Sequence, residues 1–324
     1  MRMRIVVTGG AGFIGSHYVR SLCSGAYPAF AGAHVVVLDL LTYAGTLTNL
    51  AGCDAEFVHG DIRDADTVAT VLEGTDVVVH FAAESHVDRS IAGAADFVST
   101  NVVGTQVLLA GALAAGVDRF VHVSTDEVYG SIDEGAWAET SPLLPNSPYS
   151  ASKAGSDLLA RAYHRTHGLP VCITRCSNNY GPHQFPEKVI PLFVTNLLDG
   201  HKVPLYGDGL NVRDWLHVDD HCRGIQLVAE KGRDGEVYNI GGGTELTNRE
   251  LTHLLLDAVG AGPEMVEPVR DRLGHDRRYC VDWRKIATEL GYAPHVRFAE
   301  GLAAAVAWYR DRRDWWEPLK SKSA

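Results

Sequence analysis

A chain of 324 residues, 46% hydrophobic and 21% charged, can bury a large core, and its composition is that of an ordinary globular protein. Its formal net charge of −11 argues against nucleic acid as a partner, although local arginines can still bind an anionic small ligand. We expect no membrane-spanning run and no signal peptide, and six scattered cysteines without a Cys-x-x-Cys pair favour a reducing, cytoplasmic location.

The first half of the chain alternates short, Val-rich runs with helix-like segments. We expect strands at residues 4–8, 34–38, 56–59, 76–81 and 119–124, and helices at 13–23, 65–72 and 97–115. Nearly continuous apolar runs are typical of strands that are buried on both faces of a parallel sheet. This half therefore predicts a doubly wound, Rossmann-type α/β fold, with further strands at 171–175 and 236–240.

After about Cys176 four prolines interrupt this pattern, which predicts a smaller, discontinuous C-terminal substrate domain. We expect residues 1–176 plus about 212–240 to form the Rossmann domain, and about 177–211 plus 241–324 to form the second domain. The second domain should contain helices at 247–259 and 298–312. Trp308, Trp315 and Trp316 are interpreted as packing residues, although the segment 315–324 is expected to be partly frayed.

A glycine pattern predicts a dinucleotide site near the N-terminus. Gly9, Gly12 and Gly15 follow a predicted strand and open a predicted helix, where backbone must approach a pyrophosphate closely. Asp39 ends the next strand, and a carboxylate there binds a ribose diol and repels a 2′-phosphate, so NAD is favoured over NADP. Asp61 could reach the adenine or cap the helix that begins near Asp64.

A second pattern predicts hydride chemistry. Tyr149 and Lys153 are spaced i, i+4 on a predicted helix that Ser147 could cap, with Pro148 at its first position. A nearby lysine cation should lower the pKa of the Tyr149 phenol, so that it acts as a base near neutral pH. Thr125 is expected at the end of a sheet strand, where such folds bind ligands.

Two carboxyl groups, Asp126 and Glu127, directly follow Thr125. Acidic residues after a strand commonly lie in a solvated loop or cap a helix. Beside Thr125 and the Tyr149–Lys153 helix, the acid–base interpretation is favoured. The three features together predict an enzyme that oxidises its substrate, eliminates water and then reduces the product.

Six motifs resemble those of the extended short-chain dehydrogenase/reductases and, among them, the dTDP-glucose 4,6-dehydratase family. The resemblance extends over nearly the whole chain, and the motifs lie at residues 8–15, 82–90, 124–130, 176–182, 185–188 and 274–279. The Asp126-Glu127 pair and the stretch from Asn178 to Lys188 are the most specific of them. The family pattern has proline where this chain has Leu273, between two matching residues.

The resemblance implies a lyase that converts dTDP-glucose to dTDP-4-keto-6-deoxyglucose in deoxysugar biosynthesis. It implies that Tyr149 takes the O4 proton while the C4 hydride passes to NAD, with Thr125 and Lys153 binding that oxygen. Glu127 would then remove the C5 proton and Asp126 would protonate the departing O6, before the hydride returns to C6. One carboxyl must be protonated while the other is ionised, and adjacent like charges can push their pKa values apart.

The resemblance also assigns binding residues across both predicted domains. The implied cofactor contacts are Gly9, Gly12, Phe13, Ile14, Gly15, Asp39, Thr42, Asp61, Ile62, Ala82, Ala83, Thr100, Tyr149 and Lys153. The implied nucleotide-sugar contacts are Ser85, Thr125, Asn178, Lys188, Val189, Pro204, Tyr206, Arg213, Asn248, Arg272 and His275. Arginine cations suit a diphosphate on physical grounds as well.

Other activities stay open at this point. A nucleotide-sugar 4-epimerase or decarboxylase of the same superfamily shares the glycine motif, the Tyr/Lys pair and a 4-ketone, but an epimerase needs no acid for O6. A binding module that senses NAD without turnover would be expected to have lost the Tyr/Lys pair, which is intact. His217 and His221 are spaced like helical metal ligands, but no further ligand cluster completes the pattern, and no metal is expected.

The resemblance finally implies a homodimer. The helices at 100–115 and 150–167 would pair with their copies in a four-helix bundle, and packing onto the sheet is the alternative. The apolar residues that they present are Leu108, Leu109, Leu113, Leu158, Leu159 and Ala162.

Overall fold

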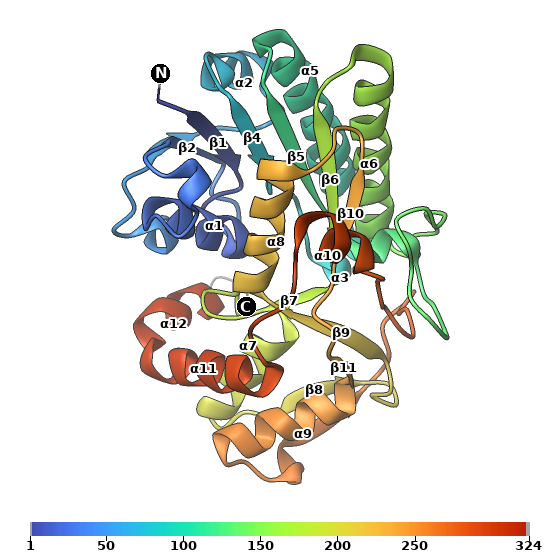
Figure 1. The fold of residues 1–324 in the computed structure, drawn as a ribbon. Coiled ribbons are helices and arrows are strands. Elements are labelled where there is room, and N and C mark those ends of the chain that lie inside the picture. The colour runs from blue at the N-terminus through green and yellow to red at the C-terminus, as the bar shows by residue number, and fades with distance from the viewer. Residues whose placement is uncertain (1, 322–324) are drawn as a thin grey trace.

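The computed structural model describes residues 2–321 and contains a seven-stranded sheet beside a smaller group of strands and helices (Figure 1). The strand order is β10-β6-β5-β4-β1-β2-β3, and all neighbours are parallel. The strands are β1 (Arg4–Thr8), β2 (His34–Asp39), β3 (Glu56–His59), β4 (Val77–His80), β5 (Arg119–Thr125), β6 (Val171–Cys176) and β10 (Val237–Ile240). The predicted Rossmann-type sheet is confirmed, with every predicted strand end within one residue.

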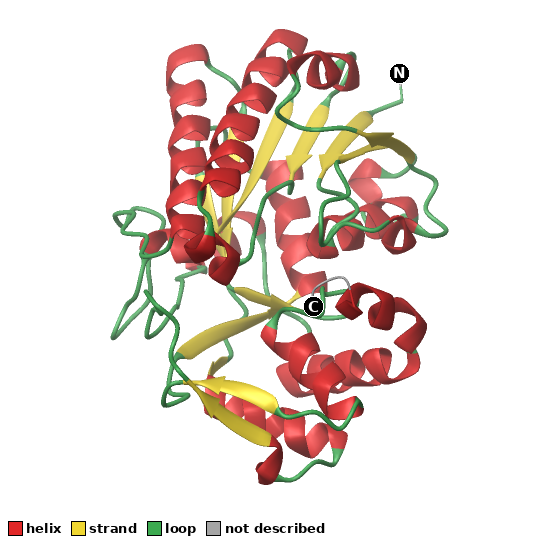
Figure 2. Ribbon diagram, turned by 180° about the vertical axis from the view of Figure 1, so that it is seen from behind, coloured by secondary structure: helices red, strands yellow, loops and turns green. Residues whose placement is uncertain are grey.

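Helices cover both faces of this sheet, as Figures 1 and 2 show from opposite sides. One face carries α1 (Phe13–Cys23) and α8 (Val218–Lys231), and the other carries α2 (Ala65–Leu72), α5 (Thr105–Ala115) and α6 (Pro148–His167). Successive strand residues point to opposite faces. Ile5 and Val7 therefore join the core beneath α1 and α8, whereas Val6 joins the core beneath α2, α5 and α6. Complete burial of each such side chain contributes about 1.5–3 kcal/mol.

The start of α6 is fixed by a capping box. The N–H of Ser150 donates to the Ser147 hydroxyl, and the N–H of Ser147 donates to the Ser150 hydroxyl, both at 3.1 Å. Pro148 occupies the first position, where its missing N–H costs nothing. The predicted cap and first residue are confirmed. They fix the first two turns of the helix, which carry Tyr149 and Lys153.

One helical stretch, residues 95–115, is long and apolar enough by composition to cross a bilayer, which corrects the expectation that no run is long enough. It consists of α4 (Ala95–Phe97), the π-helical η3 (Val98–Gly104) and α5. Asn101 in its middle is 1% exposed and donates to Ser152 of α6 at 2.8 Å. Leu108 and Leu109 are fully buried against the sheet. These contacts account for the apolar sequence within the folded domain.

The smaller part contains two short sheets. The three-stranded sheet consists of β7 (Asn178–Tyr180), β9 (Val212–His217) and β11 (Glu245–Thr247), and β8 (Val203–Tyr206) pairs with β12 (Val266–Val269). Around them lie α7 (Val189–Leu198), α9 (Asn248–Val259), α11 (Phe298–Asp311) and α12 (Arg313–Ser321). The remaining elements are α3 (Val87–Ala92), α10 (Arg284–Leu290) and the turns η1 (Pro28–Phe30), η2 (Leu47–Leu50), η4 (Asp126–Tyr129) and η5 (Pro263–Met265).

The division of the chain into two domains stays a prediction, and strand pairing refines where the chain crosses between the sheets. β9 pairs with β7 and β11 in the smaller sheet, whereas α8 packs on β5 and β6, and β10 joins the large sheet. The chain therefore returns to the large sheet at α8 rather than at residue 212. Later, α10 also packs on β10 and α8, with Ile286 fully buried.

The C-terminal segment is helical, so the expectation of fraying from residue 315 is wrong for 315–321. α12 buries Trp316 completely and Trp315 to 6% exposure. Their packing role is confirmed, because the rings of Trp308 and Trp315 lie 4.9 Å apart in an apolar cluster. Residues 322–324 of that expected segment lie outside the described residues.

Candidate active site

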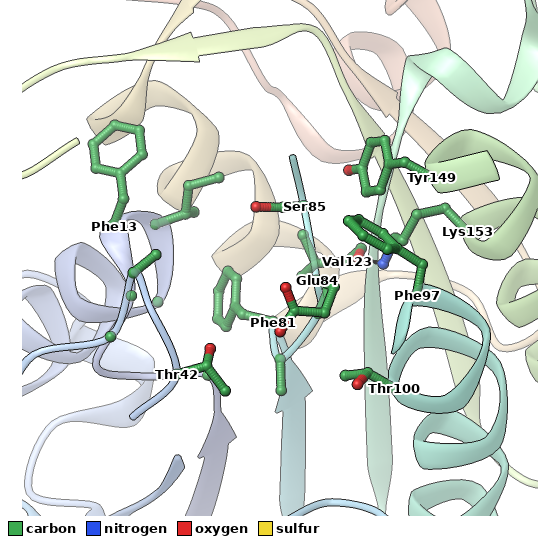
Figure 3. A pocket seen from close by; sticks show the side chains of 18 of the residues that line it. Phe13, Thr42, Phe81, Glu84, Ser85, Phe97, Thr100, Val123, Tyr149 and Lys153 are labelled. Carbon is green, nitrogen blue, oxygen red and sulfur yellow. Dashed lines mark hydrogen bonds between the residues drawn. The ribbon is translucent and has the colours of Figure 1, made fainter. Parts of the chain in front are cut away.

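A cavity of about 900 Å³ lies at the carboxyl ends of the parallel strands (Figure 3). Ligands bind at this edge in open α/β sheets. It is lined by every predicted cofactor residue, namely Gly9, Gly12, Phe13, Ile14, Gly15, Asp39, Thr42, Asp61, Ile62, Ala82, Ala83, Thr100, Tyr149 and Lys153. It is also lined by Thr125, Asp126, Glu127, Ser85, Asn178 and Lys188. The tertiary structure therefore brings the predicted cofactor and acid–base residues together.

The glycine-rich loop forms a cradle at one end of the cavity. Gly9 has a φ of +70°, and a Cβ there would lie 2.5 Å from the backbone nitrogen of Ala82. A Cβ at Gly15 would overlap the carbonyl of Gly9. Gly12 caps α1 without a side-chain bond to the helix N–H groups, so these remain available to an anion. The residues present fit the pyrophosphate of a dinucleotide.

Two acidic residues that line the cavity lie at or just after the ends of β2 and β3, and one of them contacts the glycine-rich loop directly. The Asp39 carboxylate accepts the N–H of Ala11 at 2.9 Å and that of Leu41 at 2.8 Å. A carboxylate has about four acceptor positions, so Asp39 can still accept ribose hydroxyls. Asp61 pairs with Arg63 at the cavity wall, and the cap of α2 is Asp64. The helix-cap interpretation of Asp61 is therefore wrong.

Tyr149 and Lys153 extend from α6 into the cavity (Figure 3). The ammonium group of Lys153 donates to the carbonyl of Val123 at 2.8 Å, and burial lowers the pKa of Lys153 to about 8. Burial raises the pKa of Tyr149 well above its ordinary value, and the charge of Glu127 adds to this, while a hydrogen bond with Thr125 acts in the opposite direction. The expectation that Lys153 lowers the Tyr149 pKa is therefore wrong for the protein side chains alone, because burial dominates and raises this pKa.

Asp126 and Glu127 lie in η4, the single turn that follows β5. The hydroxyl of Thr125 accepts the N–H of Glu127 at 3.3 Å and so fixes the start of this turn. Asp126 is 2% exposed, and its Oδ2 has no hydrogen-bond partner among residues 2–321. Both carboxyl groups line the cavity, which excludes the solvated-loop interpretation.

The surroundings of these two carboxyl groups affect their pKa values differently. Burial raises the pKa of Asp126 well above its ordinary value, and the charges of Glu127 and Asp214 add to this effect. Burial also raises the pKa of Glu127, but the nearby cations Arg213, Lys188 and Arg272 act against it. Asp126 therefore holds a proton more firmly, while Glu127 ionises more readily.

The second group of predicted residues lies outside the cavity, on the smaller part of the molecule. Its members are Val189 at the start of α7, Pro204 and Tyr206 in β8, Arg213 in β9, Asn248 at the start of α9, and Arg272 and His275 in the loop after β12. Arg213 donates to the carbonyl of Asp276 at 3.0 Å and lies over the ring of Tyr279. Its charge nevertheless acts on Glu127 in the cavity.

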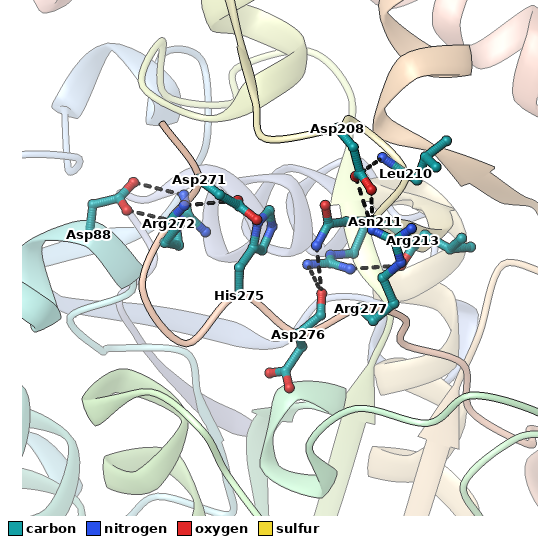
Figure 4. A network of polar contacts seen from close by, with 11 residues as sticks. Asp88, Asp208, Leu210, Asn211, Arg213, Asp271, Arg272, His275, Asp276 and Arg277 are labelled. Carbon is teal, nitrogen blue, oxygen red and sulfur yellow. Dashed lines mark hydrogen bonds and ion pairs between the residues drawn. The ribbon is translucent and has the colours of Figure 1, made fainter. Parts of the chain in front are cut away.

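Arg272 joins this group to α3 (Figure 4). Its guanidinium group makes two hydrogen bonds to the carboxylate of Asp88 in α3, at 2.6 and 2.7 Å. The same guanidinium lies 5.4 Å from the centre of the Tyr206 ring, which also meets the ring of His275 edge-on. The loop after β12 is thereby held beside α3.

Sequence reasoning missed a cluster at the cavity wall. Arg89 of α3 lies over the ring of Tyr43 at 4.0 Å, and its guanidinium is 3.1 Å from the carboxylate of Glu187. All three line the cavity, and the next residue, Lys188, donates to the carbonyl of Ser85 at 2.7 Å. The motifs at 82–90 and 185–188 contain most of these residues. Their spacing could not indicate that they meet, because the contact joins separate elements.

His217 and His221 make contacts at α8 that explain both residues. His217 caps the helix by accepting the N–H of Asp219, and His221 contacts the side-chain amide of Asn179 at 2.9 Å. Among residues 2–321 no group of three or more His, Cys, Asp or Glu side chains could hold a metal ion.

Comparison with known proteins gives one family. Residues 6–305 match the model of the GDP-mannose 4,6 dehydratase family. The chain is 65% identical over 324 residues to a dTDP-glucose 4,6-dehydratase of Streptomyces antibioticus, covering 99% of this chain and 97% of that protein. It is 68% identical, with a TM-score of 0.97, to the crystal structure of a dTDP-glucose 4,6-dehydratase from Streptomyces venezuelae with NAD and dTDP bound, covering 98% and 100% of the two chains.

A UDP-glucose 4-epimerase from Thermotoga maritima, solved with UDP-glucose, shares the fold at lower identity. It is 36% identical with a TM-score of 0.88, covering 95% of this chain and 99% of that one. The dehydratases are thus nearly twice as similar in sequence as this epimerase. The chain belongs to the dTDP-glucose 4,6-dehydratase family of NAD-dependent extended short-chain dehydrogenase/reductases.

Proposed function

We propose that this chain dehydrates dTDP-glucose to dTDP-4-keto-6-deoxyglucose by C4 oxidation, elimination of water across C5 and C6, and reduction at C6. The observation that carries the proposal is that the buried Asp126 and the partly buried Glu127 line the same cavity as Tyr149. Oxidation and reduction need only a hydride carrier and a base for the hydroxyl. Elimination of water needs an acid and a second base, and these two carboxyl groups supply them.

NAD held in the cradle of Gly9, Gly12 and Gly15 would supply the hydride acceptor for C4 oxidation and the hydride donor for C6 reduction. The chain contributes binding and orientation: helix N–H groups for the pyrophosphate and the Asp39 carboxylate for the ribose. We assign the rest of the cofactor site to Phe13, Ile14, Thr42, Asp61, Ile62, Ala82, Ala83 and Thr100, all of which line the cavity.

Tyr149 is the base for the sugar O4 proton, with Thr125 and Lys153 stabilising that oxygen. Burial and the Glu127 charge oppose ionisation of Tyr149, so its phenolate requires added positive charge nearby. An oxidised nicotinamide ring, which is cationic, would supply such charge. Proton removal by Tyr149 is thereby coupled to the presence of oxidised cofactor.

The two carboxyl groups have different tasks. Glu127 removes the C5 proton that the 4-ketone has made acidic, and it returns a proton there after reduction. Asp126 donates a proton to the departing O6, so that the leaving group departs as water. The stronger rise of the Asp126 pKa and the cations around Glu127 support this assignment of acid and base.

The nucleotide part of the substrate is assigned to residues of the smaller part of the molecule that lie outside the cavity. Arg213 and Arg272 bind the diphosphate, because guanidinium groups match phosphate oxygens with two parallel hydrogen bonds. We assign the remaining contacts with the substrate to Ser85, Thr125, Asn178, Lys188, Val189, Pro204, Tyr206, Asn248 and His275. In this arrangement the sugar extends toward Glu127.

The exposed faces of two helices support a homodimer. Val98, Val103, Leu113 and Leu158 are 37–54% exposed on the helical stretch 95–115 and on α6, which pack side by side. Large apolar side chains gathered on one face commonly mark an interface. We infer that these helices pair with their copies in a four-helix bundle, while Leu108 and Leu109 serve the monomer core.

The six cysteines are free thiols, which supports a reducing, cytoplasmic compartment.

The decisive experiment uses dTDP-glucose carrying deuterium at C4 and no added cofactor. The proposed function requires a product lighter by one water, with deuterium at C6. A C4-epimerised product of unchanged mass would indicate an epimerase, and binding without any product would indicate an NAD-sensing module. A decarboxylase would leave dTDP-glucose unchanged and would release carbon dioxide only in a parallel assay with a sugar nucleotide that carries a C6 carboxylate.

A variant isolates the elimination step. Glu127→Gln should leave C4 oxidation measurable as NADH absorbance, while exchange of the C5 proton with solvent falls by about 10²–10⁴-fold. Glu134→Gln, in an exposed loop, is the matched control and should leave both steps unchanged. Exchange at the parent rate in Glu127→Gln would show that another group is the base.

A further inference from the structure

Asn49 in η2 connects the C-terminal helix to the glycine-rich loop. Its side-chain NH₂ donates to the carbonyl of Ala11 at 2.9 Å, and its side-chain oxygen accepts the indole N–H of Trp315 at 2.9 Å. Asn49 is 2% exposed and Trp315 is 6% exposed, so water competes little for either bond. One amide thus links the smaller part of the molecule to the cofactor loop. Figure 1 shows α12 next to the region of α1.

Ala11 lies between Gly9 and Gly12 and is fully buried. Its N–H donates to Asp39 at 2.9 Å, and its carbonyl accepts the Asn49 amide as well as the N–H of Thr46 at 3.1 Å. Both polar groups of this residue are therefore fixed. Because Gly12 caps α1, the position of Ala11 sets where the free helix N–H groups point.

The orientation of the Asn49 amide depends on Trp315. An indole N–H can only donate, so it requires the oxygen of Asn49 and turns the NH₂ group toward Ala11. His183 contacts the same oxygen at 3.1 Å, and Arg20 fixes the backbone by donating to the Asn49 carbonyl at 2.7 Å. With the indole N–H absent, one contact that selects this orientation is lost.

Trp315 is held firmly enough to act as a fixed donor. Its ring packs 4.9 Å from that of Trp308, and the neighbouring indole of Trp316 donates to the carbonyl of Tyr309 at 2.7 Å. Arg313 donates to the carbonyl of Leu198 at 2.9 Å and thereby ties the start of α12 to the end of α7.

We propose that Trp315 and Asn49 are positioning residues for cofactor retention: the hydrogen bond between them holds the glycine-rich loop in its NAD-binding form. A loop already fixed before binding loses less conformational freedom when the ligand arrives, so the complex dissociates more slowly. Retention matters here because the hydride must return from the same NAD molecule that accepted it. The proposal concerns NAD binding alone and does not depend on which sugar is turned over.

The test is the rate at which NAD leaves the holoenzyme, measured by dilution into an NAD scavenger without any sugar nucleotide. Trp315→Phe keeps the aromatic ring and removes the N–H, so NAD release should accelerate about two- to tenfold, the effect of one neutral hydrogen bond. Turnover at saturating NAD and the KM for dTDP-glucose should stay within twofold. Trp308→Phe, in the same cluster but without a bond to Asn49, should not change NAD release.

A double-mutant cycle separates positioning from general packing. Asn49→Ala should also accelerate NAD release, and adding Trp315→Phe to it should have no further effect. The proposal is overturned if Trp308→Phe and Trp315→Phe accelerate release equally, or if Trp315→Phe acts in full on the Asn49→Ala background. Thermal unfolding of the apo forms shows whether each variant folds. If Asn49→Ala does not fold, the proposal is judged from the NAD release rates of Trp315→Phe and Trp308→Phe alone.

Discussion

The residues proposed for the cofactor and those proposed for the sugar nucleotide are positioned in different ways. In the cavity, functional groups follow parallel strands directly, and most are buried: Thr125, Asp126 and Lys153 are all below 9% exposed. Outside the cavity, Arg272 comes from a long loop and is oriented by an ion pair with Asp88. The proposed catalytic groups are thus positioned by strand ends and a capped helix, whereas a proposed substrate-binding group is positioned by a loop that contacts another part of the chain.

This comparison predicts that changes at strand ends cost turnover, while changes in the loops shift substrate affinity. The largest effect is expected for Asp126→Asn, which keeps the shape but cannot donate the acid proton. Its rate of water loss should fall by about 10²–10⁴-fold, while the KM for dTDP-glucose changes little.

The measurement is product formation in single turnovers, with NADH absorbance reporting C4 oxidation. Asp133→Asn, in the exposed loop beyond η4, is the control. A large rise in KM with unchanged turnover would place Asp126 in binding instead of catalysis.

The next largest effect concerns the stability of the fold, which a buried ion pair between α6 and β6 supports. Asp157 of α6 is 1% exposed and pairs with Arg175 at 2.8 Å. Asp157→Asn leaves the Arg175 charge without its partner, so the free energy of unfolding should fall by about 3–5 kcal/mol in urea titrations. Asp234→Asn, which removes a half-exposed partner of Arg119, should cost less than about 1 kcal/mol.

The pH dependence of that loss has a definite sign. Burial alone would raise the pKa of Asp157. Arg175 and His122 lower it by more than burial raises it, so that this pKa is about 2 in the folded protein. A depressed folded pKa contributes stability above the unfolded value of about 3.9 and loses it as the pH falls toward 2. The difference between parent and Asp157→Asn should therefore shrink below pH 4. A constant difference down to pH 2.5 would contradict the assigned ion pair.

The third prediction concerns the effect of Arg213, a proposed substrate-binding residue, on the pKa of Glu127. Burial raises the pKa of Glu127, and Arg213 is the largest influence against this rise. A base must be ionised, so activity is lost as the pH falls through this pKa. Arg213→Met should raise the pKa further and move the acid limb of the kcat profile upward by about one pH unit.

The matched variant is Arg277→Met, an exposed arginine of the same region that pairs with Asp208. Its acid limb should stay where the parent has it. An unmoved limb in Arg213→Met, accompanied only by a higher KM, would confine Arg213 to diphosphate binding.

The smallest effect is expected at the loop after β12, which carries Arg272. The Asp88–Arg272 pair is partly exposed. If Arg272 binds the substrate diphosphate as proposed, the Asp88 carboxylate competes with the phosphate for the guanidinium. Asp88→Asn should lower the KM for dTDP-glucose by about two- to fivefold at low salt and by less at high salt, because screening weakens exposed charges. Asp208→Asn serves as the comparison, and a higher KM in Asp88→Asn would mean that orientation outweighs competition.

Local pattern was sufficient for most of the large sheet. Val-rich runs gave the seven strands, the glycines with Asp39 gave the dinucleotide site, and Ser147-Pro148 gave the start of α6. These features are readable because each depends on neighbours within a few residues: a strand buried on both faces, a tight turn, a helix cap. The same holds for Tyr149 and Lys153, which one helical turn places on the same face.

Tertiary structure alone decided which residues are buried and which distant residues meet. It buried Asp126 more deeply than Glu127 and surrounded Glu127 with cations from three separate segments, so the order of their pKa values follows from packing. It also folded α12 back so that Trp315 meets Asn49, where the sequence suggested a frayed end. Contacts between residues far apart in the chain leave no periodic signal, because each partner alone looks like an ordinary polar or aromatic residue.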